Sequence, residues 1–180
     1  MQNETLTFLR HVLPPEGWKV ACCKRPHGMQ QMFVKTFEEQ AELLLHWSND
    51  NLDTYHACAT FAERGSRKHE NVQLVRSLWA DIDTREGKPD APYANRAEAA
   101  QAVMDFSASL ALPDPLFVDS GFGLHIYWVL EDMPRPKWQR YADSLKAACL
   151  AKGLKIDPAR TADASSILRT PGTFNFKHAQ

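Results

Sequence analysis

The sequence predicts an α+β protein organised around one acid-bearing strand. Segments with strand and helix patterns alternate in an uneven order, which favours α+β over a doubly wound parallel sheet. An apolar run at residues 78–80 leads directly into Asp81 and Asp83. Residues 116–130 have the pattern of a tight hairpin that turns at two glycines. With 180 residues, 44% of them hydrophobic, the chain is long enough for one domain with a proper core.

Composition excludes several classes of protein. The formal net charge of −1 gives no global basic field, so any nucleic-acid contact would depend on local patches and be weak and salt-sensitive. No segment has the pattern of a membrane span or a signal peptide, so we expect a cytoplasmic protein with no membrane partner. The four cysteines lack CxxC spacing, which indicates reduced thiols rather than a zinc ribbon.

The first half of the chain is expected to form two helices and three strands. An apolar stripe predicts a helix over residues 5–13, ended by prolines. Thr36 and Glu39 have capping-box spacing and open a second helix that continues through Trp47. Short strands are expected over residues 18–20, 32–34 and 55–61, the first two separated by a polar segment. No internal repeat interrupts this order.

A charged, glycine-containing segment at residues 63–70 precedes the acidic strand. It holds Arg64, Arg67 and Lys68 within five positions. Two interpretations stand side by side: a solvated loop, or a loop that contacts the phosphates of a template or a triphosphate.

The second half begins with a linker rich in glycine and proline at residues 86–92. Apolar stripes predict helices over residues 97–112 and 136–152, and apolar runs predict strands over 116–120, 124–130 and 154–157. The final segment, residues 160–180, is rich in Thr, Ser, Asp and Gly.

Asp81 and Asp83 are the first candidate site. In an extended strand alternate side chains share a face, so both carboxylates point the same way while Ala80 and Ile82 point into the fold. Two like charges side by side at the end of a buried strand are costly unless a cation compensates them. Hard oxygen ligands suit Mg²⁺ or Mn²⁺. The alternative is a strand that runs out into a solvated acidic turn.

The predicted hairpin turn is the second candidate. Gly121 and Gly123 let backbone approach a ligand closely, Ser120 offers a hydroxyl, and His125 offers an imidazole just after the turn. This combination suits phosphate oxygens. The alternative is that the glycines only satisfy the geometry of the turn.

Two further features follow in the C-terminal part. Asp157 ends an apolar run and is a candidate third carboxylate, with Asp163 as its competitor; each is also explained by a turn or a helix cap. Arg169 and Lys177 flank a Pro-Gly turn. A fork-shaped and a point-like cation beside an acidic metal cluster suit the binding of a nucleoside triphosphate.

Taken in order, these motifs resemble the catalytic domain of the archaeo-eukaryotic primase superfamily, the primase-polymerases. The similarity is greatest to the branch found in phages, plasmids and other mobile elements, including the CRISPR-associated primase-polymerases. It covers roughly residues 55–177. The matching motifs are Asp-x-Asp at Asp81, Ser-Gly-x-Gly-x-His at Ser120, hydrophobic-Asp at Asp157, and Arg-x-Pro-Gly-Thr-x-Asn-x-Lys at Arg169, the last being the most specific.

The resemblance implies a two-layer core with an RRM-like catalytic sheet and flanking helices. Residues 1–180 would form one catalytic domain, with flanking elements over 1–54 and the motif-bearing core over 55–177. It would be excised from a longer replication protein that continues into a helicase or accessory primase domain, in a bacterial, phage or plasmid context. It also lacks the zinc-binding insertion of some relatives.

The implied activity is that of a nucleotidyltransferase, a DNA primase or polymerase that synthesises primers from nucleoside triphosphates on single-stranded DNA. Two Mg²⁺ or Mn²⁺ ions would be held by Asp81, Asp83 and Asp157, or Asp163 in place of the last. The triphosphate would contact the residues of the second and fourth motifs: Ser120, Gly121, Gly123, His125, Arg169 and Lys177.

Three other functions compete with this interpretation. One is a non-catalytic module that binds a replication origin or single-stranded DNA, although intact acidic residues argue against it. A rolling-circle replication nuclease needs a His-x-His pair and a nucleophilic Tyr, and residues 125–127 offer only one His. A metal-dependent nuclease would explain the carboxylates but not the Arg169 to Lys177 signature.

Overall fold

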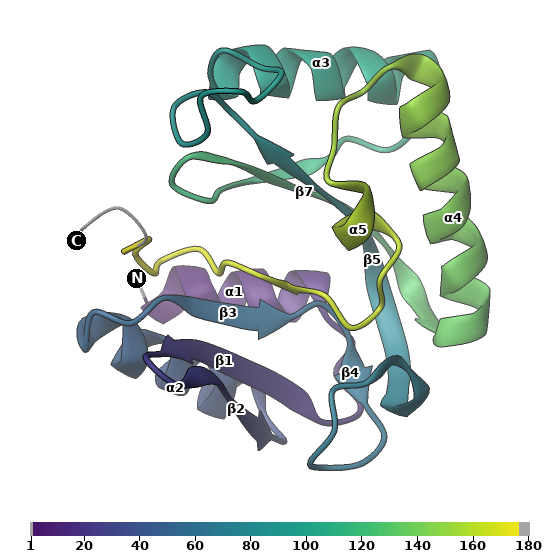
Figure 1. Ribbon diagram of the computed structural model, residues 1–180. Coiled ribbons are helices and arrows are strands. Elements are labelled where there is room, and N and C mark those ends of the chain that lie inside the picture. Colours follow the sequence, from purple (N-terminus) through teal and green to yellow (C-terminus); the bar gives the residue numbers. More distant parts are fainter. Residues whose placement is uncertain (1, 177–180) are drawn as a thin grey trace. The chain divides into compact units, whose positions relative to one another are not determined.

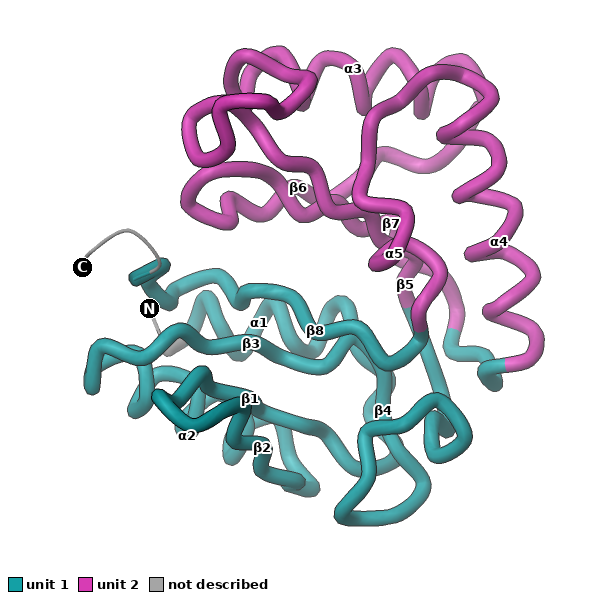
Figure 2. Tube along the Cα trace, in the orientation of Figure 1, with its two compact units in different colours: residues 1–76, 132–135, 164–180 teal, residues 77–131, 136–163 magenta. Residues whose placement is uncertain are grey.

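The computed structural model describes residues 2–176 and confirms the α+β class (Figure 1). The chain forms two compact units (Figure 2). Unit 1 contains the chain up to residue 76, residues 132–135 and the chain from residue 164. Unit 2 contains residues 77–131 and 136–163. Two four-stranded sheets are present, with strand orders β2-β1-β3-β8 and β4-β5-β7-β6.

Unit 1 is built on the first sheet and two helices. Its helices are α1 (Gln2–Val12) and α2 (Phe37–Asn49), and its strands are β1 (Lys19–Arg25), β2 (Gly28–Val34), β3 (Thr54–Ala57) and β8 (Ile167–Leu168). The ring of Phe8 in α1 meets that of His56 in β3 edge-to-face at 5.2 Å. Gln40 of α2 donates to the carbonyl of Val20 in β1 at 3.0 Å. Both helices are thus fastened to the sheet.

The helices predicted for this half are confirmed, and strands are present where they were predicted but with different bounds. The capping box at Thr36 is present in full. Strands β1 and β2 are longer than predicted, because they form one continuous antiparallel hairpin that turns before Gly28. The segment predicted at residues 55–61 is interrupted and divides into β3 and β4 (Thr60–Phe61). The charged loop contains a short 3-10 helix, η1 (His69–Asn71).

Unit 2 contains the strands that carry the motifs. Its strands are most of β5 (Val72–Asp83), all of β6 (Leu116–Asp119) and most of β7 (Gly123–Pro134), and its helices are α3 (Arg96–Ser109), α4 (Arg135–Lys152, from Pro136 on) and α5 (Pro158–Thr161). One core joins α3 and α4 to the sheet. It buries Ala80 and Ile82 of β5, Ile126 of β7, and Val103 and Cys149 of the two helices.

One predicted strand of this unit is absent. Residues 154–157 are extended without strand pairing and lead into α5, since Asp157 caps that helix and Pro158 occupies its first turn. All four cysteines are buried and none forms a disulfide. Among the described residues, no helix is both long and apolar enough to span a membrane.

Candidate functional site

The two carboxylates of β5 point away from the core, as the alternation predicts. Ala80 and Ile82 are buried under the helices at 0% and 1% exposure. The side chains of Asp81 and Asp83, on the opposite face, are 25% and 54% exposed. The fold therefore presents both carboxylates together on one face of one strand.

The imidazole of His125 lies beside the first of these carboxylates. Leu124 and Ile126 enter the core, so His125 points to the other face of β7. Its Nε2 lies 3.5 Å from Oδ1 of Asp81, and its side chain is only 6% exposed. The distance is longer than that of a strong hydrogen bond. The second motif and the first thus meet in the structure.

A glycine makes this approach possible. A Cβ placed on Gly123 would lie 2.3 Å from the backbone oxygen of Ile82, a distance that real side chains do not adopt. The start of β7 therefore passes so close to β5 that only hydrogen fits between them. The close packing of the two strands therefore requires a glycine at position 123, two residues before His125.

Asp157 is held next to Asp81 by the backbone. Its N–H donates to the carbonyl of Asp81 at 2.7 Å. Its own Oδ1 accepts from the N–H of Ala159 at 2.9 Å and caps α5. The indole of Trp79 donates to the carbonyl of Arg160 at 2.8 Å, which fastens α5 to β5. Asp163 lies beyond α5, where its N–H donates to the carbonyl of Arg160 at 3.4 Å.

Lys88 supplies a cation to this acidic group. Its Nζ lies 3.1 Å from Oδ2 of Asp83. That hydrogen bond and the charge of Asp83 raise the pKa of Lys88, with smaller contributions from Asp157 and Asp81. The lysine also lines a pocket of about 320 Å³ between residues 83–92 and 155–158. Asp81, Asp83 and Asp157 therefore all stabilise the charged form of Lys88.

The acidic residues do not form a ready metal cluster in this conformation. Within residues 2–176, no three His, Cys, Asp or Glu side chains converge as a metal site would require. Each carboxylate has a partner instead: Asp81 has His125, Asp83 has Lys88, and Asp157 has the first turn of α5. The donor set nevertheless suits a hard divalent cation, since it consists of carboxylate oxygens and already holds an ammonium.

The turn between β6 and β7 carries the other residues of the second motif. Gly121 has φ +99°, a conformation that favours glycine. Its N–H donates to Oδ1 of Asp119 at 2.7 Å, and the N–H of Ser120 donates to the carbonyl of Gly123 at 3.0 Å. Thr84 fastens this turn to the end of β5, because its Oγ1 donates to the carbonyl of Phe122 at 2.7 Å.

Arg169 belongs to unit 1, where it makes a buried ion pair. Its Nη1 lies 2.8 Å from Oδ1 of Asp53, and the two side chains are 11% and 9% exposed. The guanidinium also lies over the ring of Tyr55 at 4.9 Å. Asp53 accepts a second bond from the N–H of Phe176 at 2.9 Å. Arg169 thus anchors the segment that follows β8, and Lys177 lies outside the described residues.

The three basic residues of the charged loop also belong to unit 1. Arg67 donates to the carbonyl of Ser165 and, at 3.4 Å, to Gln31. Arg64 is exposed and lines a pocket of about 440 Å³ together with Glu63 and Glu70. Lys68 is exposed and precedes η1.

Sequence reasoning missed the residues that support these motifs. Lys88 lay in a segment interpreted as a linker, and its position five residues after Asp83 was the only signal available. Asp119 directly precedes Ser120, and an Asp two residues before a glycine is a known turn pattern. Arg96 of α3 forms ion pairs with Glu86 and Asp119, and no sequence signal joined it to either residue.

The burial of Tyr127 bears on one competing function. Tyr127 is the tyrosine nearest to His125 in sequence, and it is 1% exposed. A tyrosine that attacks a DNA phosphate must reach it, so this residue is a poor nucleophile for a rolling-circle nuclease.

Comparisons with known proteins are consistent with the fold described above. No family model matches the sequence. A replication protein from Clostridium perfringens is 26% identical over 170 residues, which cover 90% of this chain and 37% of that protein. The chain thus spans little more than a third of that relative's length. The polymerase domain of Mycobacterium tuberculosis Ligase D, solved in complex with DNA, matches with a TM-score of 0.51 at 17% identity, over 97% of this chain and 75% of that one.

Proposed function

We propose that this chain is the catalytic module of a replication primase-polymerase. It would transfer nucleotides from nucleoside triphosphates to a growing strand on a single-stranded DNA template. The observation that carries the proposal is the meeting of Asp81 and His125 on one face of the β5–β7 sheet, at 3.5 Å. Similarity in fold to a polymerase domain and in sequence to a replication protein supports it.

The proposed reaction is a displacement at phosphorus. The 3′-hydroxyl of a primer or initiating nucleotide loses its proton and attacks the α-phosphorus of the incoming triphosphate. A new P–O bond forms, the bond from the α-phosphorus to the bridging oxygen breaks, and pyrophosphate leaves. Catalysis of such transfers depends mainly on positioning and on compensating the charge of the phosphates.

We assign the acidic residues to metal binding. Asp81, Asp83 and Asp157 would hold Mg²⁺ or Mn²⁺, and the backbone bond from Asp157 to Asp81 favours Asp157 over Asp163 as the third ligand. A bound divalent cation supplies charge neutralisation at the phosphates and lowers the pKa of the attacking hydroxyl.

We assign the second motif to the triphosphate. His125 would donate a hydrogen bond to a phosphate oxygen from Nε2, the ring nitrogen that faces Asp81. Ser120 would offer its hydroxyl to the same oxygens, and Gly121 and Gly123 would let a phosphate approach the backbone of the turn closely. Arg169 and Lys177 remain proposed triphosphate contacts. Arg64, Arg67 and Lys68 remain proposed template or triphosphate contacts.

The experiment is incorporation of labelled nucleotides on a single-stranded DNA template with Mg²⁺ or Mn²⁺, first without and then with a primer. Products without a primer would identify a primase, and extension alone would identify a polymerase. The critical variants are Asp81→Asn and Asp83→Asn, which keep size and remove charge. Asp114→Asn, on an exposed loop before β6, is the matched control.

We expect both site variants to lose synthesis by about 10²-fold or more while Asp114→Asn retains it, because loss of charged catalytic groups costs several kcal/mol. Unchanged synthesis in Asp81→Asn would contradict the assignment. A wild-type chain that binds single-stranded DNA but neither binds nor incorporates nucleotides would instead be a non-catalytic binding module.

A further inference from the structure

The turn that carries Ser120 and Gly121 is held by hydrogen bonds within the turn and by hydrogen bonds from Thr84 at the end of β5. Asp119, the last residue of β6, accepts the N–H of Gly121 on Oδ1 at 2.7 Å. Phe122 accepts both the hydroxyl and the N–H of Thr84, at 2.7 and 3.3 Å. The bond to Gly121 uses Oδ1 of Asp119, and Oδ2 contacts a residue outside the turn.

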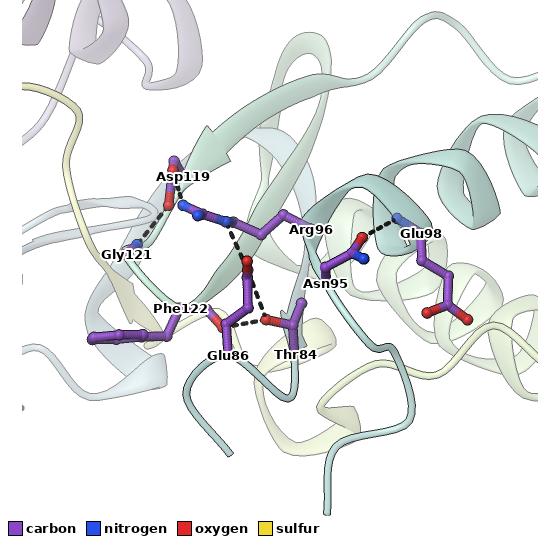
Figure 3. A network of polar contacts seen from close by, with 8 residues as sticks. All are labelled: Thr84, Glu86, Asn95, Arg96, Glu98, Asp119, Gly121 and Phe122. Carbon is purple, nitrogen blue, oxygen red and sulfur yellow. Dashed lines mark hydrogen bonds and ion pairs between the residues drawn. The ribbon is translucent and has the colours of Figure 1, made fainter. Parts of the chain in front are cut away.

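That partner is Arg96, the first residue of α3 (Figure 3). Its Nη1 forms an ion pair with Oδ2 of Asp119, and its Nε donates to Oε2 of Glu86 at 2.9 Å. The same oxygen of Glu86 lies 3.4 Å from Oγ1 of Thr84, whose proton is donated to Phe122. One guanidinium thus connects the turn before β7 with the segment that follows β5.

The planar form of the guanidinium suits this task. Arginine presents its donors in a rigid fork, so it can hold two carboxylates at a set separation, which a lysine ammonium does not. The charge of Asp119 is the main cause of the raised pKa of Arg96, and an arginine side chain is cationic at neutral pH. The start of α3 is itself ordered by its cap, since Asn95 accepts the N–H of Glu98 at 2.9 Å.

We propose that Arg96 is a positioning residue of the nucleotide site, which holds Asp119 so that the turn keeps its conformation and the hydroxyl of Ser120 stays arranged for phosphate. The inference rests on the proposed function, because it presumes that the turn binds a triphosphate. Arg96 acts through Asp119 and touches no ligand itself.

Solvent exposure separates this role from a purely structural one. The side chains of Arg96, Glu86 and Asp119 are 38%, 37% and 57% exposed. Ion pairs with this exposure contribute little to the stability of a whole domain. The loss of Arg96 should therefore affect the order of the turn much more than it affects unfolding.

The test measures the Kd for a non-hydrolysable nucleoside triphosphate in Mg²⁺, together with the Tm of each variant. Arg96→Gln removes the cation, and Arg96→Lys keeps the charge but not the fork. Asp119→Asn removes the ion pair while its amide oxygen can still accept the N–H of Gly121. The matched control is Arg76→Gln, since Arg76 makes a bidentate ion pair with Asp132 at 2.7 and 3.0 Å in unit 1.

We expect Arg96→Gln and Asp119→Asn each to raise the Kd about three- to tenfold, with no further increase in the double variant, because both break the same contact. Arg96→Lys should fall between Arg96→Gln and the wild type. The control should bind as the wild type does, although its Tm falls at least as much as that of Arg96→Gln.

Three results would overturn the inference. The Kd of Arg96→Gln equal to that of the wild type would remove the positioning role. Weaker binding in Arg96→Gln with unchanged binding in Asp119→Asn would make Arg96 a direct contact. The same loss in Arg76→Gln would show a general structural effect. A wild-type chain that binds no triphosphate would refute the proposed function itself.

Discussion

The ammonium of Lys88 lies 3.1 Å from Oδ2 of Asp83, on the carboxylate that the proposed metal would need. Asp81 and Asp157 also raise the pKa of this lysine, so three carboxylates share its charge. The ammonium of Lys88 thus offsets part of the negative charge of these carboxylates when no metal ion is bound. It must leave Asp83 before a metal ion can use that oxygen.

Lys88→Met should therefore strengthen metal binding. The variant removes a tethered competitor, and because exposed ion pairs are weak we expect the Kd for Mn²⁺ to fall by only about two- to fivefold. Mn²⁺ binding is measured by electron paramagnetic resonance without nucleotide. Lys155→Met, in the same pocket, is the control and should bind as the wild type does. An unchanged Kd in Lys88→Met would show that the ammonium does not compete.

His125→Ala should weaken nucleotide binding and leave the fold intact. A hydrogen bond to a charged phosphate contributes about 1.5–3 kcal/mol, which predicts a Kd raised by about 10- to 100-fold. Direct binding of a labelled triphosphate measures the change, and circular dichroism monitors the fold. Affinity at the wild-type level would remove His125 from the triphosphate site.

Gly123→Ala should damage both stability and activity. The new Cβ would lie 2.3 Å from the backbone oxygen of Ile82, and neither strand can move without disturbing the core beneath. Overpacking of this kind costs about 1–3 kcal/mol in the free energy of unfolding, which urea denaturation measures.

Gly87→Ala is the control for that substitution. Its Cβ would lie 2.2 Å from the Cβ of Phe122 in the β6–β7 turn, an overlap that two loops can relieve by moving, whereas Gly123 lies against a paired strand over the core. It should lower the free energy of unfolding less than Gly123→Ala does. Equal losses would mean that β5 and β7 separate more easily than their contact indicates.

Asp53→Asn should destabilise the protein by about 2–4 kcal/mol at pH 7. The substitution leaves the cation of Arg169 without a charged partner, and both side chains are only about 10% exposed. Asp132→Asn breaks the more exposed pair with Arg76 and should cost about 1 kcal/mol or less. Urea unfolding of both variants compares them directly.

The cost of Asp53→Asn should also depend on pH. Burial alone would raise the pKa of Asp53. The hydrogen bond and charge of Arg169 and the N–H of Phe176 together lower it by more than burial raises it, so the pKa lies below its usual value. A carboxyl with a lowered folded pKa stabilises above its unfolded pKa and loses that effect as pH falls through the folded one. The difference between wild type and variant should therefore shrink below about pH 4. A constant difference from pH 7 to pH 3 would contradict the ion pair.

Local rules predicted several parts of the fold well. The capping box at Thr36 and the alternation of Ala80, Asp81, Ile82 and Asp83 depend on neighbours within a few residues, so the sequence states them directly. The hairpin at residues 116–130 is predicted for the same reason. The prediction placed strands at β1 and β2 but underestimated their length, since the exposed edge strand β2 contains polar residues in place of an alternating apolar pattern.

The amino-acid sequence by itself determined the motif residues, the α+β class and the face of β5 on which Asp81 and Asp83 lie. Tertiary structure decided which distant groups meet them: His125 and Lys88 in unit 2, and Asp53 as the partner of Arg169 in unit 1. The physical reason is the separation along the chain over which each kind of interaction acts. Periodicity and capping act over a few residues, whereas Arg96 and Asp119 are 23 positions apart in the chain and meet through the packing of unit 2.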